Sequence, residues 1–247
     1  MEFDLQYYKS LPSTNLKAVK DIQEGTARHG IVIWTEDQTQ GRGNGTNQWE
    51  SEKGKNLTFS LVIEPHFLHP AEQFFITQLI SVALYDTLKK ILSPENLSIK
   101  WPNDLYYENK KIAGVLIQNY VKGPQINFAV IGVGLNVNQN IFLSDAPNPA
   151  SLIQFTGKEN DIRSILNELL QTFKKYYELL QDPQKRVKMH EKYLEHLYLK
   201  DQWANFSDES GTFSGKIKGI NDYGQLIIEE RDGNHRAFGF KEVKLEQ

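Results

Sequence analysis

Three strand-like runs follow one another between residues 97 and 138, and only short polar links separate them. The runs are LSIKWPNDLYY (97–107), KIAGVLIQNYV (111–121) and INFAVIGVGLNVN (126–138), joined by ENK and KGPQ. Links of three or four residues suit hairpins between antiparallel neighbours, because a parallel connection needs a much longer crossover. The sequence therefore predicts a largely antiparallel sheet.

The remaining segments add two strands, several helices and a separate C-terminal unit. The strands are GIVIWTE (30–36) and NLTFSLVIE (56–64), on either side of a glycine-rich stretch. Apolar spacing and end signals predict four helices, at about 14–24 (capped by Ser13 or Thr14, with Gly25 after it), 71–92 as the longest, 161–180 and 183–197. A loop rich in Pro and Asn is expected around 144–150. From about Trp203, short alternating strands broken by turn residues predict a small antiparallel barrel of about 45 residues.

Composition excludes several classes of function. The 247 residues include 28 Lys and Arg, 31 Asp and Glu, and no Cys, which argues against disulfides, thiol catalysis and binding to polyanions. Residues 200–247 hold seven basic and nine acidic residues, a net charge of −2, so we expect no nucleic-acid binding there. With no apolar signal region and no run long enough to span a bilayer, we expect a cytoplasmic chain without membrane contact.

The stretch TQGRGNGTNQW (39–49) alternates glycines with polar residues and ends in an indole. Its glycines suggest a phosphate cradle, because they let backbone N–H groups approach an anion. Both common phosphate loops fail, however, since Thr46 stands where the dinucleotide motif needs Gly and Trp49 stands where the P-loop needs Gly. A surface turn without a ligand stays open for these residues taken alone.

Polar residues interrupt the apolar strands at a few positions that could carry chemistry. In KWPNDLYYENKKIAGVLIQ these are Lys100, Asn103, Asp104 and Lys111, and Gly114 leaves room for a close neighbour. A lysine held against apolar walls can stabilise a transferring phosphoryl oxygen or a carboxylate. Charges at strand ends are more commonly solvated, and Asn136 can equally be an ordinary strand-end turn residue. The sequence has no zinc-protease helix and no Gly-x-Ser-x-Gly elbow, which favours electrostatic over covalent catalysis.

Taken in order along the chain, four segments resemble the biotin protein ligase family, biotin–[acetyl-CoA-carboxylase] ligase. They are STN (13–15), QTQGRGNGTNQW (38–49), KWPNDLYYENKKIAG (100–114) and GVGLNVN (132–138). The resemblance implies an α+β fold in which a mixed, largely antiparallel sheet is packed with helices, of the class II synthetase-like biotin/lipoate transferase type. It implies a catalytic domain at 1–199 and a small SH3-like β-barrel domain at 200–247. It also implies ATP-dependent biotinylation, through biotinyl-5′-AMP, of a lysine on a biotin carboxyl carrier protein.

The resemblance further assigns roles to individual residues. Biotin would be bound by Ser13, Thr14, Asn15, Gln38, Gly41, Arg42, Lys111 and Gly114. ATP and the adenylate would be bound by Arg42, Gly43, Asn44, Trp49, Asn103, Lys111 and Asn136. Lys111, Arg42 and Asp104 would be catalytic, with Asp104 orienting the incoming lysine amine. No metal ligand is certain, although the Mg²⁺ that accompanies ATP would lie near Asn136.

The sequence departs from the family pattern in two places, and two alternative functions stay open. Many relatives have a winged helix-turn-helix before the Ser-Thr-Asn block, so this chain resembles the monofunctional form without that DNA-binding domain. Asn44 and Asn47 stand where many relatives carry further arginines, which leaves retention of the adenylate open. A homodimer is possible. The alternative functions are a lipoate or octanoate ligase of the same superfamily and a non-catalytic, biotin-responsive binding module.

Overall fold

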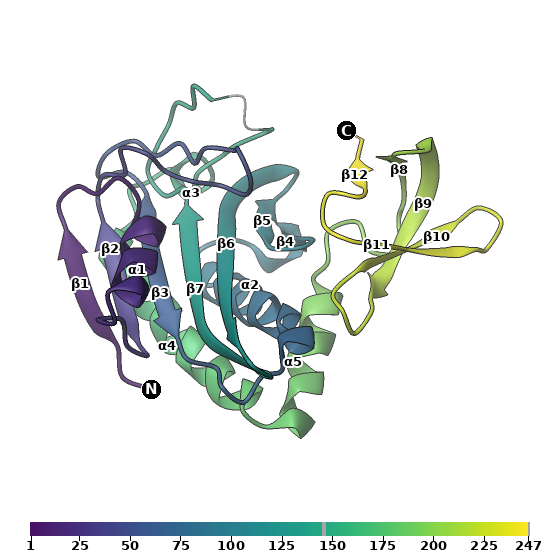
Figure 1. Ribbon diagram of the computed structural model, residues 1–247. Helices are drawn as coiled ribbons and strands as arrows, with labels where there is room; N and C mark the ends of the chain where they lie inside the picture. Colours follow the sequence, from purple (N-terminus) through teal and green to yellow (C-terminus); the bar gives the residue numbers. More distant parts are fainter. Residues whose placement is uncertain (145–146, 247) are drawn as a thin grey trace.

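The structure of the chain is a computed structural model, and it describes residues 1–144 and 147–246. Its larger part is a seven-stranded sheet in the order β1-β2-β3-β7-β6-β5-β4 (Figure 1). The strands are β1 Asp4–Tyr8, β2 Ile31–Thr35, β3 Leu57–Ile63, β4 Leu97–Lys100, β5 Asp104–Tyr107, β6 Lys110–Lys122 and β7 Gln125–Leu135. β1 and β2 are parallel and every other neighbouring pair is antiparallel, so the sheet is mixed and largely antiparallel as predicted.

The three consecutive strand-like runs between residues 97 and 138 form one end of this sheet. β6 pairs with β7 from Ala113 to Lys122, with Gly114 opposite Gly134. The first run is two strands rather than one, because β4 and β5 fold back on each other around a turn at Trp101–Asn103. Pro102 lies in that turn, after a cis peptide bond, where a residue without an N–H leaves no gap in a ladder.

The helices form in the predicted places, with two corrections. They are α1 Thr14–Gln23, α2 Phe74–Leu88, α3 Leu152–Thr156, α4 Ile162–Leu180 and α5 Pro183–Glu195, and short 3₁₀ turns lie at Pro70–Glu72 and Pro94–Asn96. The expected helix at 71–92 is not the longest described helix, because α2 has 15 residues and α4 has 19. The short α3 follows the predicted 144–150 loop and was not expected, and residues 145 and 146 of that loop lie outside the described part.

Helices cover both faces of the sheet. α1 packs on one face, where Ala18 meets Ile33, Val62 and Val130 in a small buried cluster. α2, α4 and α5 form a layer on the other face (Figure 1). None of the described helices has the length and apolar character needed to cross a membrane.

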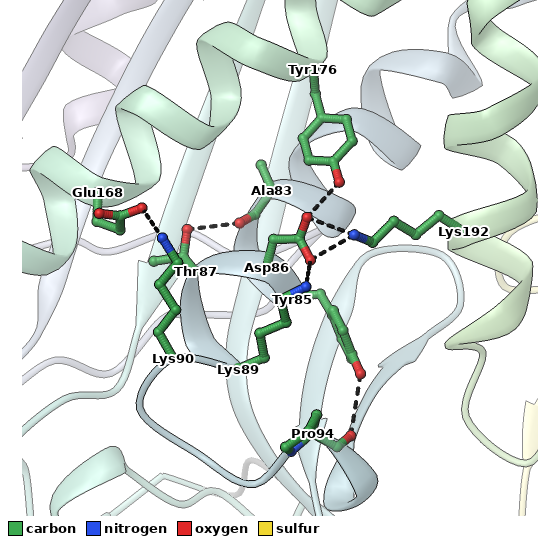
Figure 2. Close-up of polar contacts among 10 residues, drawn as sticks. All are labelled: Ala83, Tyr85, Asp86, Thr87, Lys89, Lys90, Pro94, Glu168, Tyr176 and Lys192. Carbon is green, nitrogen blue, oxygen red and sulfur yellow. Dashed lines mark hydrogen bonds and ion pairs between the residues drawn. The ribbon is translucent and has the colours of Figure 1, made fainter.

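A half-buried carboxylate joins three helices of that layer. Asp86 on α2 accepts hydrogen bonds from Lys192 on α5 at 2.7 and 2.6 Å and from the Tyr176 hydroxyl on α4 at 2.5 Å (Figure 2). Lys89, one turn along α2, adds an ion pair at 2.7 Å. The Asp86 side chain is only 13 % exposed. Tyr176 and Lys192 come from two other helices, so Asp86 fixes the positions of α2, α4 and α5 relative to one another.

The C-terminal strands form a second, five-stranded antiparallel sheet in the order β11-β10-β9-β8-β12. They are β8 Trp203–Asp208, β9 Gly211–Ile220, β10 Leu226–Glu230, β11 His235–Phe238 and β12 Lys244–Leu245. Over residues 203–246 the strand pairing runs from β11 to β12 without closing into a barrel ladder. Phe206 and Ile228 of this sheet belong to the same buried cluster as the core of the large sheet, so the two sheets share one core.

Candidate ligand site at the glycine-rich hairpin

The glycine-rich stretch between β2 and β3 folds as a small hairpin. Gly43 N–H donates to the Asn47 carbonyl at 2.8 Å, and Trp49 N–H donates to the Gly41 carbonyl at 3.0 Å. A methyl group on Gly41 would lie 2.3 Å from the Trp49 carbonyl oxygen, so only glycine fits where the two arms cross. Arg42 and Asn44 are exposed on this hairpin, and the structure does not gather them with the buried residues below.

The Trp49 indole lies directly on the large sheet. A methyl group on Gly134 would be 2.2 Å from the indole Cε2, and one on Gly114 would be 3.1 Å from Cζ3. These two glycines are opposite each other on β7 and β6, so together they form a flat floor for the ring. The indole Nε1 is buried and has no hydrogen-bond partner among the described residues.

Lys111 and Asp104 form an ion pair beside this glycine floor. Lys111 Nζ lies 2.6 Å from Asp104 Oδ2, and their side chains are 24 % and 26 % exposed. The same Nζ lies 6.0 Å from the centre of the Trp49 ring. Lys111 is fixed through its backbone, because its N–H donates to the Asn148 carbonyl and its carbonyl accepts from Ala150. A cation, a carboxylate and an aromatic ring thus meet at one edge of the floor.

Buried polar groups gather at the start of α1, where Ser13, Thr14 and Asn15 are all at most 5 % exposed. Gln38 Oε1 accepts from the Thr14 backbone N–H at 2.8 Å and lies 3.2 Å from its hydroxyl. Ser60 on β3 donates to the Thr14 hydroxyl at 2.8 Å. Asn15 Oδ1 is buried without a partner among the described residues, so a hydrogen-bond acceptor remains open there.

The two asparagines predicted to border a nucleotide lie just before β5 and just after β7. Asn103 donates to the Val115 carbonyl at 2.9 Å. Asn136, at the end of β7, donates to the Ala150 carbonyl at 3.0 Å, and its Oδ1 has no partner among the described residues. In the described ranges, no three His, Cys, Asp or Glu side chains lie close enough together to hold a metal ion.

A second lysine, Lys100, lies on the strand next to Asp104. Lys100 is the cross-strand neighbour of Asp104. Its Nζ lies 3.2 Å from the Tyr106 hydroxyl and 4.8 Å from the centre of that ring. Burial lowers the pKa of Lys100, Asp104 opposes this effect, and Lys111 adds to it. Burial, with a contribution from Asp104, raises the pKa of the Tyr106 phenol.

The structure adds residues to the site that the sequence alone did not single out. Ser60 could have been noticed, because it is a polar residue inside the apolar strand LTFSLVI. Gly132 lies opposite Ser60, and a methyl group there would be 2.6 Å from Asn15 Nδ2. Three groups of site residues follow one another across β3, β7 and β6. They are the buried polar group of Ser13, Thr14, Asn15 and Gln38, the glycine floor under Trp49, and the Lys111–Asp104 ion pair.

Comparison with known proteins identifies the family of the chain. The model of the biotin/lipoate A/B protein ligase family matches residues 7–136, and the model of the biotin protein ligase C-terminal domain matches residues 205–244. The bifunctional ligase/repressor BirA of Bacillus subtilis is 30 % identical over 95 % of this chain and 72 % of its own length. The biotin–[acetyl-CoA-carboxylase] ligase of Paracoccus denitrificans is 30 % identical over 66 % of this chain and 69 % of its own.

Solved structures show the same fold. The biotin protein ligase of Aquifex aeolicus in complex with biotin and ATP has a TM-score of 0.80 at 23 % identity and covers 99 % of each chain. Biotin acetyl coenzyme A carboxylase synthetase of Helicobacter pylori, with bound biotinylated ATP, has a TM-score of 0.64 at 22 % identity, over 96 % of this chain and 99 % of that one.

The family model and the two relatives define the class of the chain, which is a protein ligase. The chain belongs to the biotin/lipoate A/B protein ligase family. Within that family it also carries the C-terminal domain of the biotin protein ligases, and it is a ligase enzyme.

Proposed function

We propose that this chain attaches biotin to a lysine of a biotin carboxyl carrier domain, with biotinyl-5′-AMP as the intermediate of two steps in one site. The observation that carries the proposal is the Lys111–Asp104 pair at 2.6 Å, beside the Gly114 floor and the Trp49 ring. A cation and a carboxylate side by side suit a reaction that first transfers an adenylyl group and then deprotonates an amine.

The buried group at the start of α1 suits the polar ureido head of biotin. Gln38 Oε1 and the unpaired Asn15 Oδ1 are acceptors for ureido N–H groups, and the Ser13 and Thr14 hydroxyls can donate to its carbonyl. The apolar chain of biotin would then run along the glycine floor toward Lys111. Trp49 covers that floor, so we propose that the ring and its hairpin move to admit biotin and then close over it.

In the first step a carboxylate oxygen of biotin attacks the α-phosphorus of ATP. A new O–P bond forms, the bond to the bridging oxygen of the β-phosphate breaks, and pyrophosphate leaves with the electron pair. Lys111 would bridge the reacting carboxylate and phosphate oxygens, because its ammonium can offset their negative charge in a partly dehydrated site. Gly41, Gly43 and the exposed Arg42 and Asn44 would reach the phosphate end as the hairpin closes.

In the second step the acceptor lysine attacks the acyl carbon of the mixed anhydride. The C–O bond to the phosphate breaks and AMP leaves, while the amine gives up its protons. Asp104 would orient the incoming amine and accept one proton once Lys111 has turned to the phosphate. Asn103 would border the adenylate from the same turn that begins β5.

The nucleotide would lie between Trp49 and Asn136. The indole supplies a flat surface for adenine, and the unpaired Asn136 Oδ1 is a hard oxygen that fits the preferences of Mg²⁺. A single protein oxygen fits a magnesium ion held mainly by ATP phosphates, whose charge it would neutralise. We further propose that residues 1–199 hold this chemistry in the cytoplasm, with residues 200–247 as an accessory domain.

Purified protein incubated with labelled biotin, ATP, Mg²⁺ and a biotin carboxyl carrier domain tests the proposal. We expect label on the carrier, dependent on ATP, and release of pyrophosphate before transfer. Absence of label on the carrier would refute the proposed activity. Label from lipoate or octanoate in place of biotin would instead assign the chain to the other branch of the family.

A further inference from the structure

Ser60 is a buried residue of β3 that takes no part in the two proposed steps. It is 0 % exposed, in a strand whose residues are all buried. Its hydroxyl donates to the Thr14 hydroxyl at 2.8 Å, and Thr14 is only 3 % exposed. Burying a hydroxyl costs free energy unless it forms a hydrogen bond, and here the bond goes to a residue of the proposed biotin site.

The hydrogen bonds that start at Ser60 have a fixed direction. Gln38 accepts from the backbone N–H of Thr14 at 2.8 Å, so the amide atom that faces Thr14 must be the oxygen. That oxygen cannot donate, so the Thr14 hydroxyl at 3.2 Å must be the donor of their contact. The hydroxyl oxygen of Thr14 is then left to accept from Ser60. The hydrogen bonds therefore run from Ser60 to Thr14 and from Thr14 to Gln38.

Asn15 is held in one orientation close to Ser60. Gly132 lies opposite Ser60 on β7, and a methyl group there would be 2.6 Å from Asn15 Nδ2 and 3.5 Å from Ser60 Oγ. The same Nδ2 donates to the Leu116 carbonyl at 3.5 Å. Asn15 Oδ1 is therefore the end of the amide that stays without a partner among the described residues. Its oxygen is an acceptor whose position is fixed by the sheet.

These groups match a cyclic urea, which has one carbonyl acceptor and two N–H donors. Gln38 Oε1 and Asn15 Oδ1 are two acceptors, and the Thr14 hydroxyl is a donor. While Ser60 donates to Thr14, the proton of Thr14 can go only to Gln38 or to a ligand. When a ureido N–H binds to Gln38 Oε1, the ligand carbonyl becomes the acceptor for that proton. Accepting a bond from Ser60 also strengthens the bond that Thr14 donates, because hydrogen bonds in a chain polarise one another.

We propose that Ser60 is a positioning residue for biotin recognition, whose hydroxyl holds Thr14 as the hydrogen-bond donor to the ureido carbonyl. This inference rests on the proposed function and names the part of biotin that the buried group selects. A ligand without a cyclic urea, such as lipoate or octanoate, would leave the two acceptors and the donor unpaired in a buried place, which costs free energy. Ser60 would thus act on the choice of substrate and not on the chemical steps.

The first test separates the binding of biotin from catalysis in the full chain. Calorimetric titration gives the Kd of biotin, and biotin-dependent exchange between ATP and pyrophosphate gives the KM of each substrate and the maximal rate. We expect Ser60→Ala to raise the Kd and KM of biotin roughly 5-fold, as fits loss of support from one neutral hydrogen bond. The KM of ATP and the maximal rate should stay within about 2-fold of the parent, because Ser60 does not touch the reacting groups.

The compound 2-iminobiotin separates positioning of Thr14 from a general loosening of the strand. Its protonated ring carries an N–H donor where biotin has the carbonyl, so the Thr14 hydroxyl finds no acceptor there. Ser60→Ala should therefore change the Kd of 2-iminobiotin by less than about 2-fold, while it raises that of biotin. Equal weakening of the two ligands would overturn the inference.

Two further variants check that Ser60 acts through Thr14. In a Thr14→Val background Ser60→Ala should weaken biotin no further, which a double-mutant cycle measures. Ser81→Ala, at a buried serine of α2 whose hydroxyl has no partner among the described residues, should leave the Kd of biotin unchanged. A full loss from Ser60→Ala in the Thr14→Val background, or a similar loss from Ser81→Ala, would show that the effect does not pass through Thr14. A parent chain that binds no biotin would instead overturn the proposed function.

Discussion

At the scale of single residues, Lys111 is the side chain on which activation of biotin should depend most. Its ammonium lies between Asp104 at 2.6 Å and the Trp49 ring. We predict that Lys111→Ala lowers adenylate formation by at least ~100-fold, because losing a key electrostatic group costs roughly 3 kcal/mol. Exchange between ATP and pyrophosphate measures this rate. Near-normal exchange by the variant would contradict the role given to Lys111, and Lys110→Ala serves as the matched control.

A second prediction at the scale of single residues concerns Gly134, on which the Trp49 ring rests. A methyl group there would lie 2.2 Å from the middle of the Trp49 indole, whereas at Gly114 the nearest indole atom is 3.1 Å away. We therefore expect Gly134→Ala to lift the ring from the sheet and to change its fluorescence and quenching by iodide, with a smaller change for Gly114→Ala. Overpacking of this kind costs about 1–3 kcal/mol, which urea unfolding can measure. Equal effects of the two substitutions would show that the ring does not rest on Gly134.

The sequence predicted residue types at the site better than their partners. It singled out Lys111 and Gly114, because lysine and glycine are unusual in apolar strands, and Trp49, because an indole ends the glycine-rich stretch. It could not show that Trp49 rests on Gly134, since those residues are far apart in the chain and meet only when β3 and β7 pair. The Lys111–Asp104 contact likewise depends on the register shift between β5 and β6, which local pattern does not encode.

At the scale of elements, Asp86 should contribute strongly to the stability of the helical layer. It joins α2, α4 and α5 through Tyr176 and Lys192 (Figure 2). Hydrogen bonds to charged groups contribute about 1.5–3 kcal/mol, so we predict that Asp86→Asn lowers the free energy of unfolding by roughly that amount at neutral pH. Chemical unfolding of both proteins measures the difference. Glu168→Gln, which removes an exposed ion pair with Lys90 on the same layer, should cost less.

The contribution of Asp86 should also depend on pH. Burial would raise the pKa of Asp86, but hydrogen bonds from Lys192, Lys89 and Tyr176 outweigh it and lower the pKa below the ordinary value. A carboxylate whose pKa is lower in the folded state adds stability above its unfolded pKa and loses it as the pH falls through the folded pKa. The gap between the parent and Asp86→Asn should therefore shrink in acid. A gap that stays constant with pH would mean that the charge of Asp86 is not what stabilises the layer.

Elements with strong local signals were predicted, and those defined by distant contacts were not. The hairpins between 97 and 138 and the helices α4 and α5 follow from periodicity and short links. β1 was missed because its segment, DLQYY, shows no clear apolar alternation and gains its structure by parallel pairing with β2. α3 has only five residues and is stabilised by a capping box at Ser151, a signal too short to stand out in a polar loop.

At the scale of the whole molecule, the C-terminal sheet is joined to the site by a seam of specific contacts. Trp101, in the turn before Asp104, donates its indole N–H to the Gly224 carbonyl at 2.9 Å. Its ring centre lies 6.3 Å from that of Phe240. A methyl group on Gly45, at the tip of the glycine-rich hairpin, would lie 2.7 Å from Lys241 Nζ. Loops of the C-terminal unit thus contact the turn before Asp104 and lie beside the tip of the glycine-rich hairpin, so loosening the seam should affect catalysis.

Two glycines of this sheet allow the seam to be tested without truncating the chain. Gly224 and Gly233 have φ angles of +80° and +83°, so alanine at either position carries a similar backbone cost of about 1–2 kcal/mol. Only at Gly224 would the new methyl group meet another element, at 2.2 Å from the Phe74 ring on α2, whereas at Gly233 nothing lies within 4 Å. We predict that Gly224→Ala lowers adenylate formation or transfer to the carrier domain well beyond Gly233→Ala, when both are assayed below their unfolding temperatures. If both half-reactions are equally fast in the two variants, the C-terminal sheet does not act on the site through this seam.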